Sequence, residues 1–314
     1  MGSKRTLSDR LYCRRQNFIK GVKRSWQWYL LLLPGLIYLI IFNYVPMAGL
    51  QIAFKNYRAS KGIWGSAWVG FEHFKRFFAY ADMWKLIWNT LAITLLSLAF
   101  FPIPIIFALF LNEVKHPKVK KTVQMVTYMP HFLSEVVVCS LVILFLQKDT
   151  GIINDVVEFF GGTRTNQLSV PGNFSWIYVI LGLWQNLGWN SILYISALSS
   201  ISSEQVEAAR IDGANRFQIL KNVYIPGIMP TIVITFLMQV GKLMNLGYSK
   251  IYLLQNSLNL EKSRVLSTYV YEIGILNGQF SYATAIGLFN NIVNIVVLLI
   301  VNRIVKRTSE ISLF

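Results

Sequence analysis

Long apolar runs separated by shorter polar segments set the pattern of this chain. Six runs are long enough to cross about 30 Å of hydrocarbon as helices. They lie near residues 28–49, 88–111, 123–146, 176–198, 227–246 and 282–301. Tryptophans and tyrosines gather at the ends of these runs, as interfacial aromatic residues do. The pattern predicts an all-α polytopic membrane protein with six transmembrane helices.

Several local features refine this prediction. Pro102 and Pro104 lie inside the second run, so we expect a kink there. Aromatic residues at 71, 74, 77 and 78 share one helical face and predict a short helix on the outer membrane surface. A second short amphipathic piece is expected at 152–160. The first apolar run is long and lacks a small-residue cleavage site, so we interpret it as a retained anchor.

Composition and charge agree with a membrane protein. Of 314 residues, 54% are apolar and 14% are charged, which is too apolar for an ordinary soluble domain. The formal net charge is +16, but Lys and Arg gather at the ends of the apolar runs, which indicates membrane orientation and not nucleic-acid binding. With the N-terminus inside, cytoplasmic segments hold 18 Lys and Arg and outer segments hold 11. We therefore expect a basic cytoplasmic tail at 1–27, a transmembrane domain at 28–302, and a cytoplasmic tail at 303–314.

Residues that could carry out a reaction are sparse. The three histidines, at 73, 116 and 131, show no metal-ligand spacing, and Cys13 and Cys139 are poorly placed to meet. Within the apolar runs, Glu135 and Lys242 could neutralise one another across two helices. No nucleophile with a base, carboxylate pair or metal set is present, so we expect no catalytic residue, no metal and no enzyme activity.

Uncharged polar and aromatic side chains are more plentiful in the last three runs. Amides offer donors and acceptors to a hydroxyl-rich neutral ligand, and aromatic rings stack on sugar faces. The same amides also serve as hydrogen-bonded links between membrane helices, so both interpretations stay open. Asn186, Asn190 and Tyr194 follow i, i+4, i+8 and can point inward together. The candidate substrate path comprises Trp184, Asn186, Asn190, Tyr194, Gln239, Asn245 and Asn290.

A polar gap at 199–225 has the local signals of a helical hairpin. Ser202 can cap a helix from Ser203 to about residue 211, and Asn215 with Gln218 offers a second start. Gly213 permits a tight turn between the two helices. We expect Val206, Ala208 and Ala209 to face a partner, with Phe217, Leu220 and Tyr224 along one face of the second helix and Pro226 ending the segment.

The stretch Glu207-Ala208-Ala209-Arg210-Ile211-Asp212-Gly213-Ala214, followed by Pro226 and Pro230, resembles the "EAA" loop of permease subunits of bacterial ABC importers. In that family the loop rests in a cleft of the cytoplasmic ATPase, and four crossings from a cytoplasmic start place residues 199–225 on that side. The resemblance implies an ATPase-coupling surface made of Glu207, Ala208, Ala209, Asp212, Gly213, Ala214, Phe217, Pro226 and Pro230. Weaker similarities at 184–190, 267–271 and 280–285 point to the polysaccharide and complex-oligosaccharide branch of carbohydrate permeases.

The resemblance also implies partners and location. We expect a multi-pass protein of the bacterial cytoplasmic membrane, in contact with lipid, that pairs with a second homologous permease and binds two ABC ATPases. An extracellular or periplasmic binding protein would deliver the oligosaccharide or polysaccharide, which crosses by alternating access. No Gly-x-x-x-x-Gly-Lys-Ser/Thr occurs in the chain, so ATP and Mg²⁺ belong to the ATPase and no cofactor is expected here.

Two other classes of function were compared with this one. An ion-coupled secondary transporter or channel for a small neutral solute would predict intramembrane carboxylates, inverted repeats or an ion site. A membrane enzyme would need the reactive groups that the chain lacks. Neither class explains the loop from Glu207 to Ala214.

Overall fold

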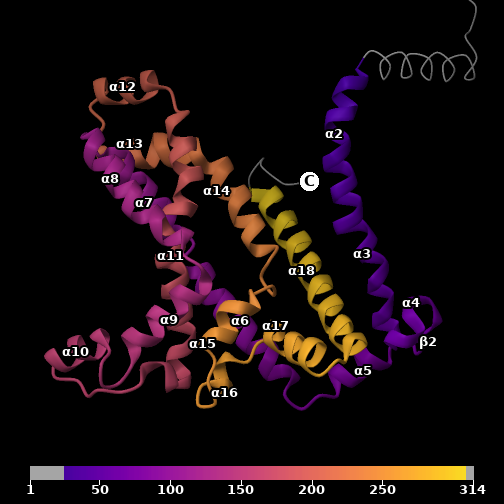
Figure 1. The fold of residues 1–314 in the computed structure, drawn as a ribbon. Coiled ribbons are helices and arrows are strands. Elements are labelled where there is room, and N and C mark those ends of the chain that lie inside the picture. The colour runs from indigo at the N-terminus through magenta and orange to yellow at the C-terminus, as the bar shows by residue number, and fades with distance from the viewer. Residues whose placement is uncertain (1–24, 309–314) are drawn as a thin grey trace, which may run out of the picture.

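The computed structural model describes residues 25–308, and these are almost entirely helical (Figure 1). Residues 1–24, which make up most of the predicted tail at 1–27 and include Cys13, lie outside the described residues, and so do residues 309–314. The first half of the chain forms α2 (Trp26–Leu39), η1 (Ile40–Tyr44), α3 (Val45–Met47), η2 (Ala48–Phe54), β1 (Lys55–Asn56), η3 (Ala59–Lys61), α4 (Gly62–Gly65), β2 (Ala67–Trp68), α5 (Glu72–Phe78), α6 (Met83–Ala99), α7 (Pro102–Glu113), α8 (Pro117–Tyr128), η4 (Met129–Phe132), α9 (Glu135–Leu146) and α10 (Ile152–Phe159). The two strands pair antiparallel, with Lys55 opposite Trp68.

The described part of the second half of the chain consists of helices joined by short loops. It forms η5 (Gln167–Ser169), η6 (Pro171–Asn173), α11 (Phe174–Ser199), α12 (Ser203–Ile211), α13 (Arg216–Ile219), η7 (Leu220–Tyr224), α14 (Ile225–Val240), α15 (Tyr248–Leu254), α16 (Leu260–Ser263), α17 (Leu266–Tyr271), η8 (Glu272–Leu276) and α18 (Phe280–Thr308). The predicted short helices at 71–78 and 152–160 appear as α5 and α10.

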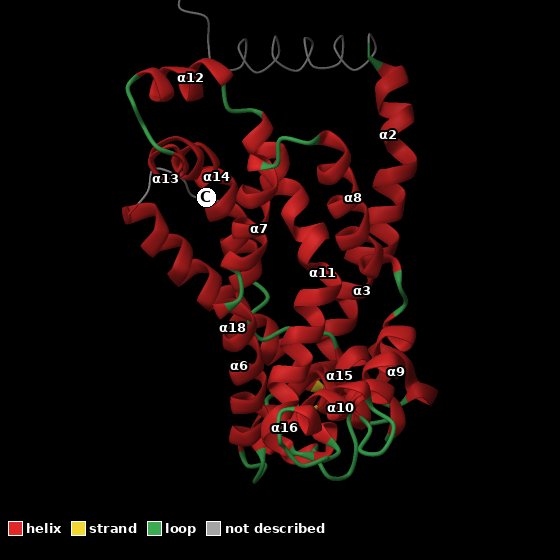
Figure 2. Ribbon diagram, turned by 90° about the vertical axis from the view of Figure 1, so that its left-hand side faces the viewer, coloured by secondary structure: helices red, strands yellow, loops and turns green. Residues whose placement is uncertain are grey.

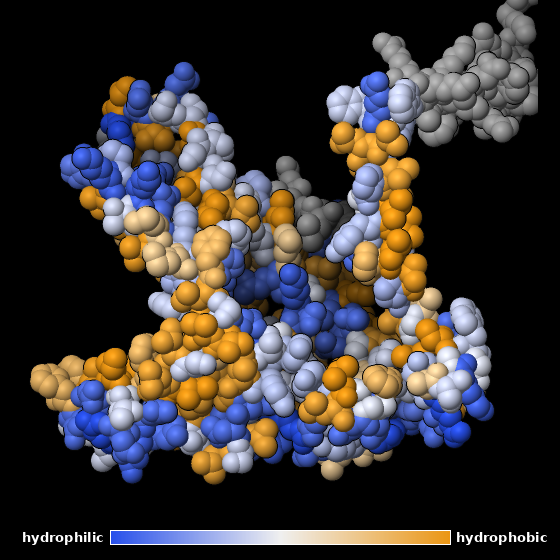
Figure 3. All heavy atoms as spheres, in the orientation of Figure 1, coloured by the Kyte–Doolittle hydropathy of each residue, from blue (hydrophilic) through white to orange (hydrophobic). Residues whose placement is uncertain are grey.

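Polar segments gather at two opposite ends of the molecule. The beginning of α2, the hairpin of α12 and α13, and the C-terminal end of α18 lie toward one end, while α10, α15 and α16 lie at the other (Figures 1 and 2). Hydrophilic residues gather over both ends, and between them hydrophobic residues lie on either side of a hollow lined with hydrophilic residues (Figure 3). This arrangement is that of a membrane-embedded molecule.

Four continuous helices of the described chain are long and apolar enough to cross a membrane: residues Trp26–Phe54, Met83–Glu113, Arg216–Val240 and Phe280–Arg307. The second of these helices is interrupted where a kink is expected, because α6 ends at Ala99 and α7 begins at Pro102, and the kink itself stays a prediction. The 26-residue helix α11 is long enough but less apolar, since Gln185, Asn186 and Asn190 lower its mean hydropathy. The count of six crossings therefore stays a prediction.

The apolar run predicted to cross the membrane at 123–146 is not one continuous helix. Helix α8 and helix α9 are bent by 100° at a short break, so this run is either a broken span or a re-entrant segment. Pro130 lies in the 3₁₀ turn that ends the first arm. Ser134 then caps the second arm by accepting a hydrogen bond from the Val137 N–H at 3.3 Å. A proline and a new N-cap within a few residues favour two helices over one.

The prediction that Pro226 ends the loop is also wrong. Residues 216–240 form one continuous helix, in which Pro226 occupies the first turn of α14. The preceding turn, η7, is π-helical, and the Ile225 N–H donates to the Leu220 carbonyl. Such a wide turn is one way in which a helix accommodates the carbonyl that a proline ring would otherwise crowd.

Helix α11 contacts α6, α7, α8 and α14 and is the central element of the fold. The buried apolar side chains form three clusters between the helices. One cluster joins α7, α11, α13, η7 and α14, and its buried residues are Ile105, Ala108, Leu109, Tyr194, Leu198, Ile219, Tyr224 and Ile228. Gly188 lets α8 approach α11 closely, because a Cβ there would lie 2.5 Å from the Thr127 carbonyl oxygen. By contrast, none of the residues of α2 is buried.

Candidate functional site

The hairpin of α12 and α13 is built by local hydrogen bonds. Ser202 caps α12 through the Glu204 N–H at 3.2 Å, and Asn215 with Gln218 forms a reciprocal capping box at the start of α13. Between them, Gly213 adopts φ +80°. The Gly213 N–H donates to the Arg210 carbonyl at 3.0 Å and the Ala214 N–H donates to the Ala209 carbonyl at 2.9 Å. These two bonds form a Schellman cap, which favours glycine at this position.

The outer surface of the hairpin is partly apolar. Ile211 is 86% exposed and Phe217 is 71% exposed. Glu207, Ala208 and Asp212 are also exposed, so they are free to meet another protein. Most of the proposed coupling residues are therefore accessible, and so are Pro226 and Pro230 at the beginning of α14.

Two residues of this loop do not face outward as predicted. Val206 and Ala209 pack against the buried cluster around Tyr194 and Leu198, together with Ala214. The reason is that α12 is amphipathic and lies over α11 and α13, so one of its faces is needed to hold the hairpin to the helices. Leu220 and Tyr224 likewise pack inward, whereas Phe217 does not.

A cavity of about 600 Å³ lies along α11, between α7, α14 and α15. Of the predicted path residues, Asn186, Asn190, Tyr194 and Gln239 line it. The three residues that the helical spacing groups together, Asn186, Asn190 and Tyr194, thus line one cavity. The Tyr194 hydroxyl is 2.8 Å from Thr235 Oγ1, a contact that links α11 to α14. The cavity is also lined by Tyr178, Thr235 and Lys250, which are absent from the substrate path predicted from the sequence.

An aromatic platform adjoins the cavity where the broken span meets α11. The ring of His131 stacks on Trp189 with centroids 4.2 Å apart and planes 8° apart. His131 Nδ1 is 2.9 Å from Asn186 Oδ1, and the Asn186 amide also donates to the Gly182 carbonyl. Asn186 therefore has two protein partners, as its helix-linking interpretation expects, and its role toward a ligand stays a prediction.

Lys250 is the charged residue of the cavity wall. It is buried on α15, and its ammonium donates to Gln185 Oε1 at 2.6 Å. Burial lowers the pKa of Lys250, and the nearby charge of Glu135 opposes that shift. Lys250 was missed because the apolar pattern placed it in an outer loop, whereas the chain folds α15 back against α9.

The predicted pairing of Glu135 with Lys242 is wrong. Glu135 accepts a hydrogen bond from the Ser249 hydroxyl. Lys242 is exposed in the turn after α14, and no ion pair joins the two among residues 25–308. The helix α14 ends at Val240, earlier than expected, so Lys242 leaves the apolar segment.

A second cavity, of about 640 Å³, lies between the turn after α14, α17 and α18. Asn245 and Asn290 line it, and Leu246 lines both cavities. Tyr248 and Tyr271 stack in its wall with centroids 4.7 Å apart. The Asn290 Oδ1 is buried and accepts no hydrogen bond within the described chain. The remaining predicted path residue, Trp184, is 49% exposed and lines neither cavity.

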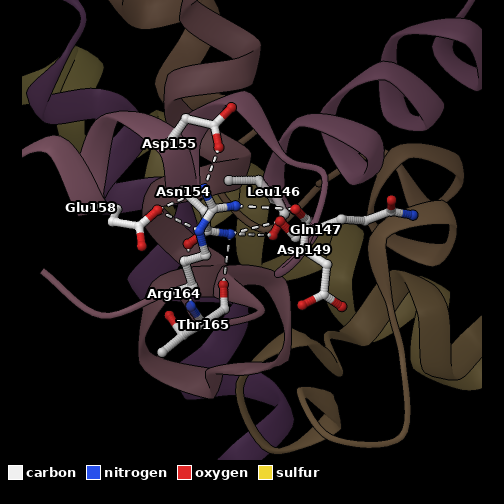
Figure 4. Close-up of polar contacts among 8 residues, drawn as sticks. All are labelled: Leu146, Gln147, Asp149, Asn154, Asp155, Glu158, Arg164 and Thr165. Atoms are coloured by element: carbon white, nitrogen blue, oxygen red, sulfur yellow. Dashed lines mark hydrogen bonds and ion pairs between the residues drawn. The ribbon is translucent and has the colours of Figure 1, made fainter.

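At the other end of the molecule, a polar clamp holds the loop that follows α10 (Figure 4). Arg164 binds Asp155 at 2.7 Å and Glu158 at 2.6 Å, and its hydrogen bond to Glu158 raises the pKa of Arg164. The buried Asn154 donates to the carbonyls of Gln147 and Thr165. The clamp therefore fixes α10 and its loop as one unit, with apolar Ile152, Val156 and Phe159 exposed on the helix.

No group of His, Cys, Asp and Glu within residues 25–308 is arranged to hold a metal ion. The polar residues that line the two cavities are mainly amides and hydroxyls. Such a site can bind and release a ligand by hydrogen bonding and stacking, which is the chemistry that passage through a membrane requires.

Comparisons with known proteins agree with this geometry. Residues 102–310 match the family described as "Binding-protein-dependent transport system inner membrane component". Protein LplB of Bacillus subtilis is 41% identical over 95% of this chain and 94% of its own length. The polygalacturonan/rhamnogalacturonan transport system permease protein YteP of the same organism is 40% identical, over 96% and 94%.

Solved structures are similar over nearly the whole chain. A bacterial ABC transporter involved in the import of the acidic polysaccharide alginate gives a TM-score of 0.84 at 38% identity, covering 93% of this chain and 99% of that one. The alginate transporter in complex with an alginate pentasaccharide-bound periplasmic protein gives 0.85 at 37% identity, covering 94% and 99%. Family, relatives and fold agree: this chain belongs to the binding-protein-dependent transport system inner membrane components, and it is a multi-pass ABC importer permease of the cytoplasmic membrane and not an enzyme.

Proposed function

We propose that this permease carries an oligosaccharide or polysaccharide through the two cavities by alternating access, driven by ABC ATPases that dock on the α12–α13 hairpin. The observation that carries the proposal is the arrangement of these sites. The exposed hairpin packs on the cluster that contains Tyr194, and Tyr194 itself lines the first cavity. A movement of the hairpin is thus transmitted directly to the cavity wall.

The neighbours of the chain support the choice of cargo. YteP is described as a polygalacturonan/rhamnogalacturonan permease, and the solved neighbours are described as alginate importers. The amide groups and the stacked aromatic rings of the two cavities suit a chain of sugar rings.

We also propose the partners that the resemblance implies. Helix α2 has no buried residue and stands apart from the other helices (Figure 1). An apolar helix of this kind needs lipid or a second permease along its length. Two ATPases would bind ATP and Mg²⁺ on the hairpin side, and an extracellular or periplasmic sugar-binding protein would dock on the side of α10 and α16.

Affinity purification from detergent-solubilised native membranes tests this function. A tag on this permease should recover an ATPase and a second permease, and the recovered complex in liposomes should take up an oligosaccharide only with ATP and the binding protein. Uptake by this chain alone, or recovery without any ATPase, would contradict the proposal.

A further inference from the structure

Lys250 lines the translocation cavity without a counter-ion, and the function just proposed does not explain it. Among the described residues that line the two cavities, it is the one with a formal charge at neutral pH. No carboxylate of residues 25–308 forms an ion pair with it. A buried charge without a partner is unfavourable, so its presence in a cavity marks a functional group.

The surroundings of Lys250 leave donors free for a ligand. An ammonium has three N–H donors. One of them binds Gln185 Oε1, and the Gln185 amide nitrogen in turn donates to the Leu133 carbonyl at 3.3 Å. Gln185 therefore positions Lys250 against α11. Glu135 accepts a hydrogen bond from Ser249 and forms no ion pair with Lys250, on which it acts as a neighbouring charge.

We propose that Lys250 binds a carboxylate of the cargo, so that this permease selects saccharides that carry uronic acid residues. The inference rests on the proposed function and adds the charge of its substrate. One ammonium matches the single charge of a carboxylate, whereas a dianionic phosphate is usually met by several cations or by the bidentate fork of arginine. The rest of the wall is neutral, with Asn186 and Asn190 for hydroxyl groups and Trp189 for a ring face.

The single cation also fits the need for passage. A path must bind its cargo well enough to admit it and weakly enough to release it. One positive charge beside neutral amides gives selection by charge, and it holds one sugar residue at a time as an acidic chain moves through.

Binding to the purified complex without the binding protein tests this inference. The probes are trigalacturonate and the same trisaccharide with all carboxyl groups methyl-esterified. Their affinities are measured by equilibrium dialysis. We expect the wild-type complex to bind the acid at least about tenfold more tightly than the ester, because a hydrogen bond to a charged group contributes that much. Lys250→Gln should remove the preference by weakening acid binding alone, and Lys250→Arg should keep it. Lys242→Gln, an exposed lysine outside the cavity, should change neither affinity.

Several outcomes separate this inference from the proposed function. If Lys250→Gln weakens both probes equally, Lys250 only positions α15 against α11, and the inference fails. Equal affinity of the wild type for acid and ester, or no binding of either, also overturns it. None of these outcomes bears on the importer assignment, which is tested by the recovery of the ATPase and by ATP-driven uptake. Recovery of ATPase with each variant serves as the folding control.

Discussion

Gly213→Val is the sharpest test of the coupling hairpin. Gly213 has φ +80°, a conformation that a β-branched residue avoids. A Cβ at this position would meet nothing within 4 Å, so the effect is backbone strain and not a clash. Holding a non-glycine residue in such a conformation costs about 1–3 kcal/mol. At about 2 kcal/mol, the balance between the native turn and other turns shifts about 30-fold.

The expected result is a loss of coupling and not a loss of folding. The strain is confined to the exposed turn between α12 and α13, so membrane insertion and recovery of the chain should stay near wild type. Ligand-stimulated ATPase activity and uptake in liposomes should both fall, because the Schellman cap that fixes the hairpin opens. Gly213→Asn is the matched control, since asparagine tolerates left-handed backbone and should retain most of the activity. Normal ligand-stimulated ATPase activity in Gly213→Val would refute the role of this hairpin.

Three further tests follow from the geometry. Gly188→Ala should lower the free energy of unfolding of the purified protein by about 1–3 kcal/mol, because the added methyl group overpacks α8 on α11. Gly182→Ala should not, because a Cβ there meets nothing within 4 Å. Equal melting temperatures of the two variants would contradict the close contact. Asn190→Ala should lower uptake without abolishing basal ATPase activity, and Trp184→Ala should lower it less because Trp184 lies outside both cavities; the reverse order of uptake rates would place the path elsewhere. Arg164→Gln should expose the loop after α10 to proteolysis, and an unchanged cleavage pattern would show that the clamp does not hold it.

The hairpin at 199–225 was predictable because its signals are local. Ser202, Asn215 with Gln218, and Gly213 each act on backbone groups within a few residues, and all three act in the structure as expected. The inward face of Asn186, Asn190 and Tyr194 was predictable for the same reason, since helical spacing alone places them together. Their roles in coupling and transport stay predictions.

The break in the third apolar run shows a limit of pattern reasoning. Pro130 and Ser134 are visible in the sequence and indicate a helix end and a helix start. The 100° bend between the two arms depends on how α8 packs on α11 through Gly188 and how α9 packs on α15. Contacts between residues so far apart in the chain leave no periodic signal.

The amino-acid sequence by itself determined the class of the protein, the approximate positions of most membrane helices, and the caps and turn of the coupling hairpin. These depend on hydrophobic run length and on hydrogen bonds between near neighbours. The tertiary structure decided which polar residues share a cavity. Asn245 and Asn290 line the second cavity and not the first, whereas Lys250 lines the first beside α11. It also decided that Val206 and Ala209 pack against the buried cluster and do not face outward. The physical reason is that a cavity is formed by packing between distant segments, and its charge is set by side chains that only the folded chain brings together.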